Sequence, residues 1–74
     1  MEPKMVVIHS RAAPNGSIVE IGERPRGLSP QEWFNFLSQT AGDAYQAFAG
    51  ARGIFRLDRD RLDALKAESV KSPA

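Results

Sequence analysis

The sequence predicts a small single α+β domain in the order strand, strand, helix, strand, helix. Three observations support this fold class: two apolar segments rich in Val and Ile lie on either side of a turn, a strongly marked helix start follows them, and a charged helical segment lies near the end of the chain. The predicted sheet is three-stranded and mixed, has the order 2-1-3, and packs against one long helix, with a short C-terminal helix in addition. We expect residues 1–70 to form the domain and residues 71–74 a flexible polar tail.

Two segments near the N-terminus have the composition of strands. Residues 5–9 contain two Val and one Ile in an apolar run, and residues 17–21 contain two Ile and one Val. Pro14, Asn15 and Gly16 lie between them, and they favour a turn because Pro presets φ while Asn and Gly tolerate positive φ. We therefore expect a hairpin, followed by an extended linker that leads into the helix.

The clearest local signal marks the start of this helix. Ser29 can cap the helix, Glu32 can complete a capping box, and Pro30 falls at the first helical position, where its missing N–H costs nothing. From this start the spacing of apolar residues predicts a helix that runs to Gly50, which has the residue type of a C-terminal cap.

A third strand is predicted at residues 53–57, and a second helix from Asp58 or Asp60 to about residue 69. A right-handed crossover from strand two to strand three leaves room for one strand between them. The uninterrupted apolar run of strand one suits that central position. Strands two and three are then the sheet edges, and the charged terminal helix favours a monomer over a homodimer.

The predicted long helix carries more apolar surface than one core-facing stripe needs. Its apolar arc spans about half of the circumference, and the remaining face is polar but almost uncharged. Two interpretations stay open: partly exposed aromatic surface beside the second helix, or a protein-binding patch, because interface cores favour aromatic residues and disfavour charge. The residues predicted for such a patch are Phe34, Phe36, Tyr45, Asn35, Gln39 and Gln46.

Arginine accounts for most of the ten basic residues, and it suits bidentate contacts with carboxylate or phosphate better than Lys does. The arginines in question can be solvated and paired with neighbouring acids, or they can form a charged patch for an acidic protein or for nucleic acid. They are Arg24, Arg26, Arg52, Arg56, Arg59 and Arg61.

No catalytic residue, metal-ligand set or cofactor is predicted. His9 and Ser10 are neighbours at a strand end, and neighbours on a strand point to opposite faces, so they do not suit a nucleophile–base pair. The segment that contains Asp58, Asp60 and Asp63 lacks the Gly and the distal Glu of a calcium-binding loop. We interpret these three residues as helix-capping acids.

The composition narrows the functional class. The net charge of +1 is not that of a strongly basic protein, the chain contains no Cys, and no apolar run approaches the ~20 residues that span a bilayer. We expect a cytoplasmic, non-enzymatic interaction protein, a small regulator or inhibitor that docks on a larger protein or complex and not on a membrane. Transcription or defence machinery, of host or phage, is a candidate target. The alternative is a nucleic-acid-binding protein that uses the arginine groups at 24–26 and 52–61.

Overall fold

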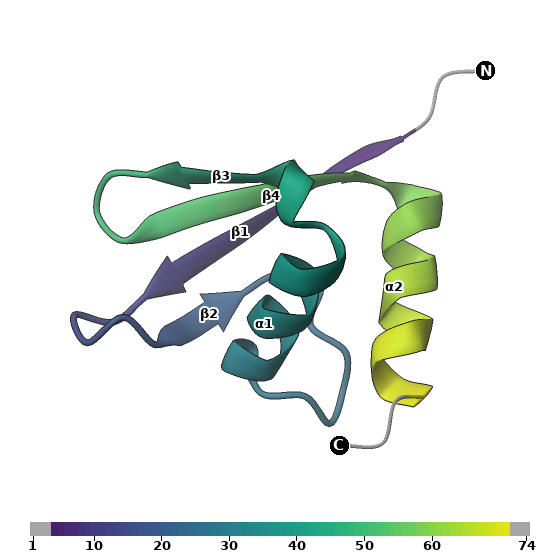
Figure 1. The fold of residues 1–74 in the computed structure, drawn as a ribbon, viewed down its shortest axis with the longest axis horizontal. Helices are drawn as coiled ribbons and strands as arrows, with labels where there is room; N and C mark the ends of the chain where they lie inside the picture. Colours follow the sequence, from purple (N-terminus) through teal and green to yellow (C-terminus); the bar gives the residue numbers. More distant parts are fainter. Residues whose placement is uncertain (1–3, 72–74) are drawn as a thin grey trace.

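The computed structural model describes residues 4–71 and shows a four-stranded antiparallel sheet with two helices (Figure 1). α1 crosses one face of the sheet, and α2 stands beside α1 near one end of the strands (Figure 1). The strand order is β2-β1-β4-β3. In chain order the elements are β1 (Met5–Ala12), β2 (Ile18–Ile21), α1 (Pro30–Thr40), the 3-10 helix η1 (Gly42–Ala44), β3 (Tyr45–Phe48), β4 (Arg52–Asp58) and α2 (Arg59–Lys71).

The predicted α+β class is confirmed, but the sheet differs from the prediction. It has four strands and not three, and all neighbouring strands are antiparallel, so it is not mixed. The neighbours β2, β1 and β4 keep the order predicted for strands two, one and three. The predicted third strand, β4, is not an edge, because β3 pairs along its outer side. Of the predicted tail at residues 71–74, all but Lys71 lies outside the described residues.

The start of α1 agrees with the sequence. The Ser29 hydroxyl accepts from the Glu32 N–H at 3.1 Å, and the Glu32 carboxylate accepts from the Ser29 N–H at 2.8 Å, which completes the capping box. Pro30 occupies the first helical position. Each bond satisfies a backbone donor that the first turn of a helix leaves free.

The predicted end of this helix is wrong: α1 stops at Thr40, ten residues before Gly50. The Ala41 N–H still donates to the Leu37 carbonyl at 2.7 Å, but Gly42 then begins the short η1 turn. Glycine lowers helix stability in an interior position, so it favours this break. The chain continues into β3, which turns back along β4 through Gly50 and Ala51, both at positive φ.

The hydrophobic core lies between the sheet and the two helices. Trp33, fully buried, stands at its centre, and its indole N–H donates to the Gly22 carbonyl at 3.0 Å. This bond satisfies the one polar atom of the indole and ties the β2–α1 linker to the helix. The buried cluster comprises Ile8, Trp33, Leu37, Ala41, Phe55, Leu57 and Leu62.

Tyr45 extends this core along β3, on the helix-bearing side of the sheet. Its ring lies 4.8 Å from the Phe55 ring and 5.6 Å from the Phe34 ring, measured between centroids. The ring also covers Gly53, where an added Cβ would lie 2.1 Å from the Tyr45 hydroxyl oxygen. Position 53 therefore favours glycine, because the Tyr45 ring occupies the space that a Cβ would fill.

This fit predicts a coupled effect of two substitutions. Gly53→Ala displaces the Tyr45 ring from Phe34 and Phe55, and we expect it to lower the free energy of unfolding by about 1–3 kcal/mol. In a Tyr45→Ala background the same change meets no ring and becomes neutral or slightly stabilising, because Ala loses less backbone entropy than Gly on folding. Urea unfolding of the two single variants and the double variant measures the coupling, and additive effects would contradict the fit.

Candidate functional site

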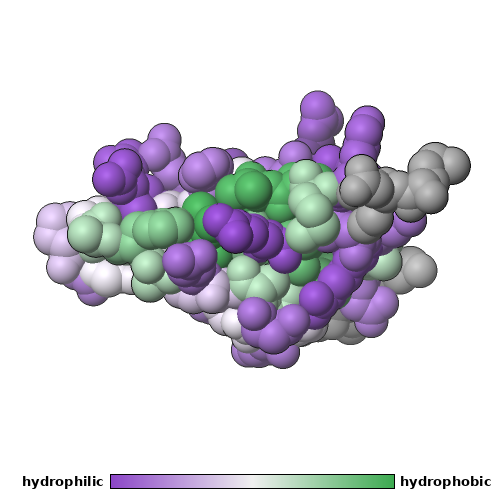
Figure 2. Space-filling model, turned by 90° about the horizontal axis from the view of Figure 1, so that it is seen from above, coloured by the Kyte–Doolittle hydropathy of each residue, from purple (hydrophilic) through white to green (hydrophobic). Residues whose placement is uncertain are grey.

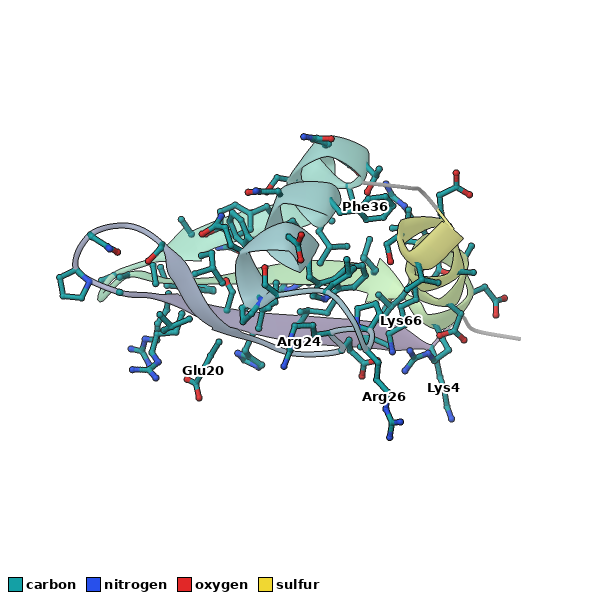
Figure 3. The ribbon with its side chains drawn as sticks, turned by 90° about the horizontal axis from the view of Figure 1, so that it is seen from below. Lys4, Glu20, Arg24, Arg26, Phe36 and Lys66 are labelled. Atoms are coloured by element: carbon teal, nitrogen blue, oxygen red, sulfur yellow. The ribbon has the colours of Figure 1, made fainter. Side chains whose placement is uncertain are left out.

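Strand alternation divides the sheet residues between two faces. On β1, Ile8 and Ser10 are buried beneath the helices, whereas Val7, His9 and Arg11 are exposed. In the described part of the chain neither helix covers the second face (Figures 1 and 3). We call this second side the helix-free face. It consists of Val7, His9 and Arg11 of β1, Arg52, Ile54 and Arg56 of β4, and Gln46 and Phe48 of β3.

The centre of the helix-free face is apolar. Ile54 lies between His9 on β1 and Gln46 on β3 and is only 5% exposed. Val7 and Phe48 extend this apolar area and remain 44% and 47% exposed. Together with the surrounding polar side chains they line an open depression of about 850 Å³. An antiparallel sheet with one solvated face normally shows polar residues there, so this apolar centre is a feature that requires explanation.

Arginine side chains form the rim of the depression. Arg52 and Arg56 come from β4, and Arg11 from β1 stands opposite Arg52 in the register. Arg11 Nε bonds Glu20 Oε1 at 2.7 Å, whereas neither Arg52 nor Arg56 forms an ion pair within residues 4–71. The two β4 guanidinium groups are therefore available for an external anion.

A second, smaller depression of about 510 Å³ continues the surface toward the β2–α1 linker. It shares Val7, His9 and Glu20 with the first depression and reaches Arg24. The Arg24 guanidinium is fixed there by a bond to the Leu28 carbonyl. In Figure 3, the labelled side chains of Glu20, Arg26 and Lys4 extend away from α1 on this side of the molecule.

On the α2 side of the molecule Arg59, Arg61 and Lys66 form ion pairs. The Glu23 carboxylate accepts hydrogen bonds from Lys66 and from Arg59, and these bonds hold the pKa of Glu23 below its ordinary value of 4.5. Glu23 itself has a positive φ of 61°, which a residue other than Gly adopts only at a cost. The ion pairs from α2 therefore hold the linker in a strained conformation.

Two further ion pairs lie on this side. Arg59 also bonds Asp63 at 2.8 Å, one helical turn away. Arg61 bonds Asp43 at 3.2 Å and the Thr40 carbonyl at 3.2 Å, and its guanidinium lowers the pKa of Asp43. The predicted group of six arginines is thus divided: Arg52 and Arg56 lie on the helix-free face, Arg24 and Arg26 lie in the linker, and Arg59 and Arg61 are paired on the α2 side.

The six residues predicted as a protein-binding patch do not share one surface, because the helix on which they were placed ends at Thr40. Phe34 contacts the Phe55 ring and Phe36 stacks on Trp33, with centroids 5.6 and 6.0 Å apart, and both are half-buried. Asn35 and Gln39 are exposed on α1. Tyr45 lies on the helix-bearing side of β3, whereas Gln46 lies on the helix-free face.

The other residues that the sequence analysis considered for catalysis or metal binding have structural roles. The buried Ser10 hydroxyl donates to the Gly53 carbonyl at 3.1 Å, on the side of the sheet opposite His9. The Asp58 carboxylate accepts from the Arg61 N–H at 2.7 Å, which confirms that Asp58 caps α2. No group of three or more His, Asp and Glu side chains within residues 4–71 is arranged to hold a metal ion.

Sequence reasoning missed Val7, Arg11, Phe48 and Ile54 as members of one surface. Part of the signal was present, since residues 5–11 alternate so that Val7, His9 and Arg11 share a face. Phe48 could not be found in this way, because it was assigned to the long helix.

Comparison of the chain with family models, with curated proteins and with solved structures found no match. Neither helix within residues 4–71 has the length and hydropathy of a bilayer-spanning segment.

The Glu23 cluster predicts a pH dependence of stability. In the unfolded chain Glu23 titrates near its ordinary pKa of 4.5, and in the folded protein the pKa is lower. The stabilisation is therefore fully present above pH 4.5 and is lost as the pH falls through the lowered pKa. Glu23→Gln is expected to remove this component and to lower the free energy of unfolding at neutral pH by roughly 1 kcal/mol, since two partly exposed ion pairs disappear.

Urea unfolding across this acidic range measures the effect. Glu68→Gln is the matched control, because Glu68 is an exposed residue of α2 that forms no ion pair among the described residues. We expect it to retain the wild-type profile. Equal profiles for wild type and Glu23→Gln would contradict the role of the cluster.

Proposed function

We propose that the protein is a non-enzymatic interaction module that docks on a larger, acidic protein through its helix-free face. The observation that carries this proposal is the apolar centre around Ile54 with unpaired Arg52 and Arg56 at its rim. Protein interfaces combine an apolar core with a polar rim and are enriched in Arg, and this face has the same composition.

The charge distribution supports an acidic partner. The formal net charge is only +1, yet several of the acidic side chains are engaged with Arg59, Arg61 and Lys66 on the α2 side. Two acids lie on the helix-free side of the sheet: Glu20 is bonded to Arg11, and Asp58 accepts from the Arg61 N–H at the start of α2. The face therefore presents net positive charge, which complements carboxylates on a partner and accelerates encounter with it.

A regulator or inhibitor needs only such a docking surface, because it acts by occupying a site on its target. The fold supports this role: a sheet held rigid by helices on one side presents the other side in a fixed shape. A backbone that is already ordered loses little further entropy on binding, which favours affinity.

Capture from lysate with matched variants tests the proposal. Arg52→Gln/Arg56→Gln removes two positive charges from the helix-free face. Asn35→Glu/Gln39→Glu changes the net charge by the same amount on the exposed side of α1. After nuclease treatment, we expect a protein retained by wild type and by the α1 variant, with at least ~10-fold weaker recovery on the variant of the helix-free face.

Equal recovery on the two double variants would contradict docking through the helix-free face. Loss on the α1 variant alone would point to the exposed residues Asn35 and Gln39 instead. Circular dichroism of both variants ensures that the comparison is made between folded proteins.

A second candidate function is the binding of single-stranded nucleic acid by the same face. It is favoured by the position of the exposed Phe48 ring directly opposite Arg52, since bases can stack on an aromatic ring while arginine contacts phosphate. If about three arginines contact phosphates, the logarithm of the binding constant falls with that of salt concentration with a slope near −2. A gel shift with a fluorescent single-stranded oligonucleotide measures this slope.

Arg52→Gln/Arg56→Gln is expected to flatten the slope, whereas Asn35→Glu/Gln39→Glu is expected to leave it nearly unchanged. Absence of a shift at low salt and at ~50 micromolar protein would eliminate this second function, given that non-specific binders reach micromolar affinity.

A further inference from the structure

The outer edge of β3 is uncharged and uncovered in the described structure. All four of its residues are exposed, and residues 44–51 contain no charged side chain. In Figure 2, which looks down on the side of the molecule where β3 lies, hydrophobic residues run along the middle and hydrophilic side chains flank and interrupt them. Proteins usually protect such edges with charge, Pro or a covering element, because exposed edges pair with other strands.

The opposite edge of the sheet has this protection. The Gln31 amide oxygen, from α1, accepts from the Ile18 N–H at 2.7 Å, so the first residue of β2 is already bonded. Glu20 also places a charge on β2, where it is bonded to Arg11. The two edges of the sheet therefore differ: on β2 the Ile18 N–H is already bonded and Glu20 carries a charge, whereas β3 has no charged residue.

The register determines which backbone groups of β3 point outward. The Ala12 N–H donates to the Ala51 carbonyl, and the Arg59 N–H to the Lys4 carbonyl, at the two ends of the β1–β4 ladder. Because hydrogen-bonded pairs alternate along an antiparallel ladder, the pairs of Gly53, Phe55 and Leu57 with β1 are hydrogen-bonded as well.

Arg52 and Ile54 then direct their backbone groups to β3, where their partners are Phe48 and Gln46. The remaining β3 residues, Tyr45 and Ala47, point their backbone groups away from the sheet. The Tyr45 N–H is bonded to the Gly42 carbonyl, which leaves the Tyr45 carbonyl and both backbone groups of Ala47 free for another strand.

We propose that β3 pairs with β3 of a second copy of this chain around a two-fold axis at Ala47. The Ala47 N–H of each copy donates to the Ala47 carbonyl of the other, and Gln46 of one copy lies opposite Phe48 of the other. This register keeps the helices of both copies on one side of a continuous eight-stranded sheet, because residues opposite each other in a ladder share a face. The two helix-free faces then form one surface.

The edge itself favours a second copy as the occupant. A two-fold contact brings the same residues together, so a charged strand would repel its own copy, whereas β3 has no charge. Ala47 is small, which suits the close approach of the backbones at the axis. A two-fold contact of this kind is closed, because it uses the one β3 edge of each copy.

The dimer is expected to be weak and reversible. A four-residue strand buries far less than the ~1,200 Å² of a standard stable interface. We therefore expect a dissociation constant on the order of 100 micromolar, and a mass that rises toward twice the monomer mass with concentration.

Sedimentation equilibrium up to ~1 millimolar tests the proposal with two matched variants. Ala47→Pro removes the outward N–H and leaves the bonds to β4 intact, because proline is tolerated on edge strands when the lost N–H faces solvent. We expect at least ~10-fold weaker dimerisation for Ala47→Pro and unchanged dimerisation for Ala47→Ser, which retains the N–H. Ala47→Glu, which places like charges opposite each other, weakens the dimer without depending on proline.

Nuclear magnetic resonance of mixed labelled and unlabelled protein tests the register. We expect an intermolecular contact between the α-protons of Gln46 and Phe48, and slower exchange of the Ala47 amide at high concentration. A monomer at ~1 millimolar overturns the proposal, and so does a dimer that folded Ala47→Pro and Ala47→Glu leave unchanged. Neither result bears on docking through Arg52 and Arg56, which is tested separately.

Discussion

The pairing of β1 with β4 is the constraint on which the rest of this structure depends. It is the longest ladder in the sheet and runs from Met5 opposite Asp58 to Arg11 opposite Arg52. Its register sends Ile8, Phe55 and Leu57 to the helices, where they form the floor of the core. The same register sends every second residue to the helix-free face. The core and the candidate site therefore both result from the alternation of side chains along β1 and β4. A shift of one residue in their register would turn the core side chains to the helix-free face and the site residues to the core.

Small size explains why one face of this sheet is left without a helix. A chain of 74 residues is long enough for only one layer of two short helices beside the sheet. The buried side chains of Trp33, Leu37 and Leu62 pack this layer against one face of the sheet. The apolar residues of the other side remain accessible around Ile54. The ion pairs follow the same division, because Arg59 and Lys66 of α2 hold Glu23 in the linker. Arg52 and Arg56 lie on the other side of the sheet and form no ion pair within residues 4–71.

Local signals in the sequence were reliable where neighbours along the chain make the decisive contacts. The capping box of α1 joins residues three positions apart, and the Asp58 cap of α2 reaches Arg61 over the same distance. The first two strands and β4 were also predicted, since their composition and the turn at Pro14–Gly16 are local properties. Of the candidate site, the sequence indicated Arg52 and Arg56 as a possible charged patch but not the face on which they lie.

What the sequence by itself determined is thus the α+β class, the helix starts and three of the four strands. The tertiary structure decided that β3 exists, and together with Gly42 it decided where α1 ends. Tyr45 and Phe48 lie three positions apart, a spacing that fits the stripe of a helix, and nothing adjacent in the chain excludes that helix. The strand forms because β4 offers unpaired backbone groups, and because Phe34, Phe55 and the space above Gly53 receive Tyr45. These contacts join residues that are far apart in the chain, so they cannot be predicted from local propensity.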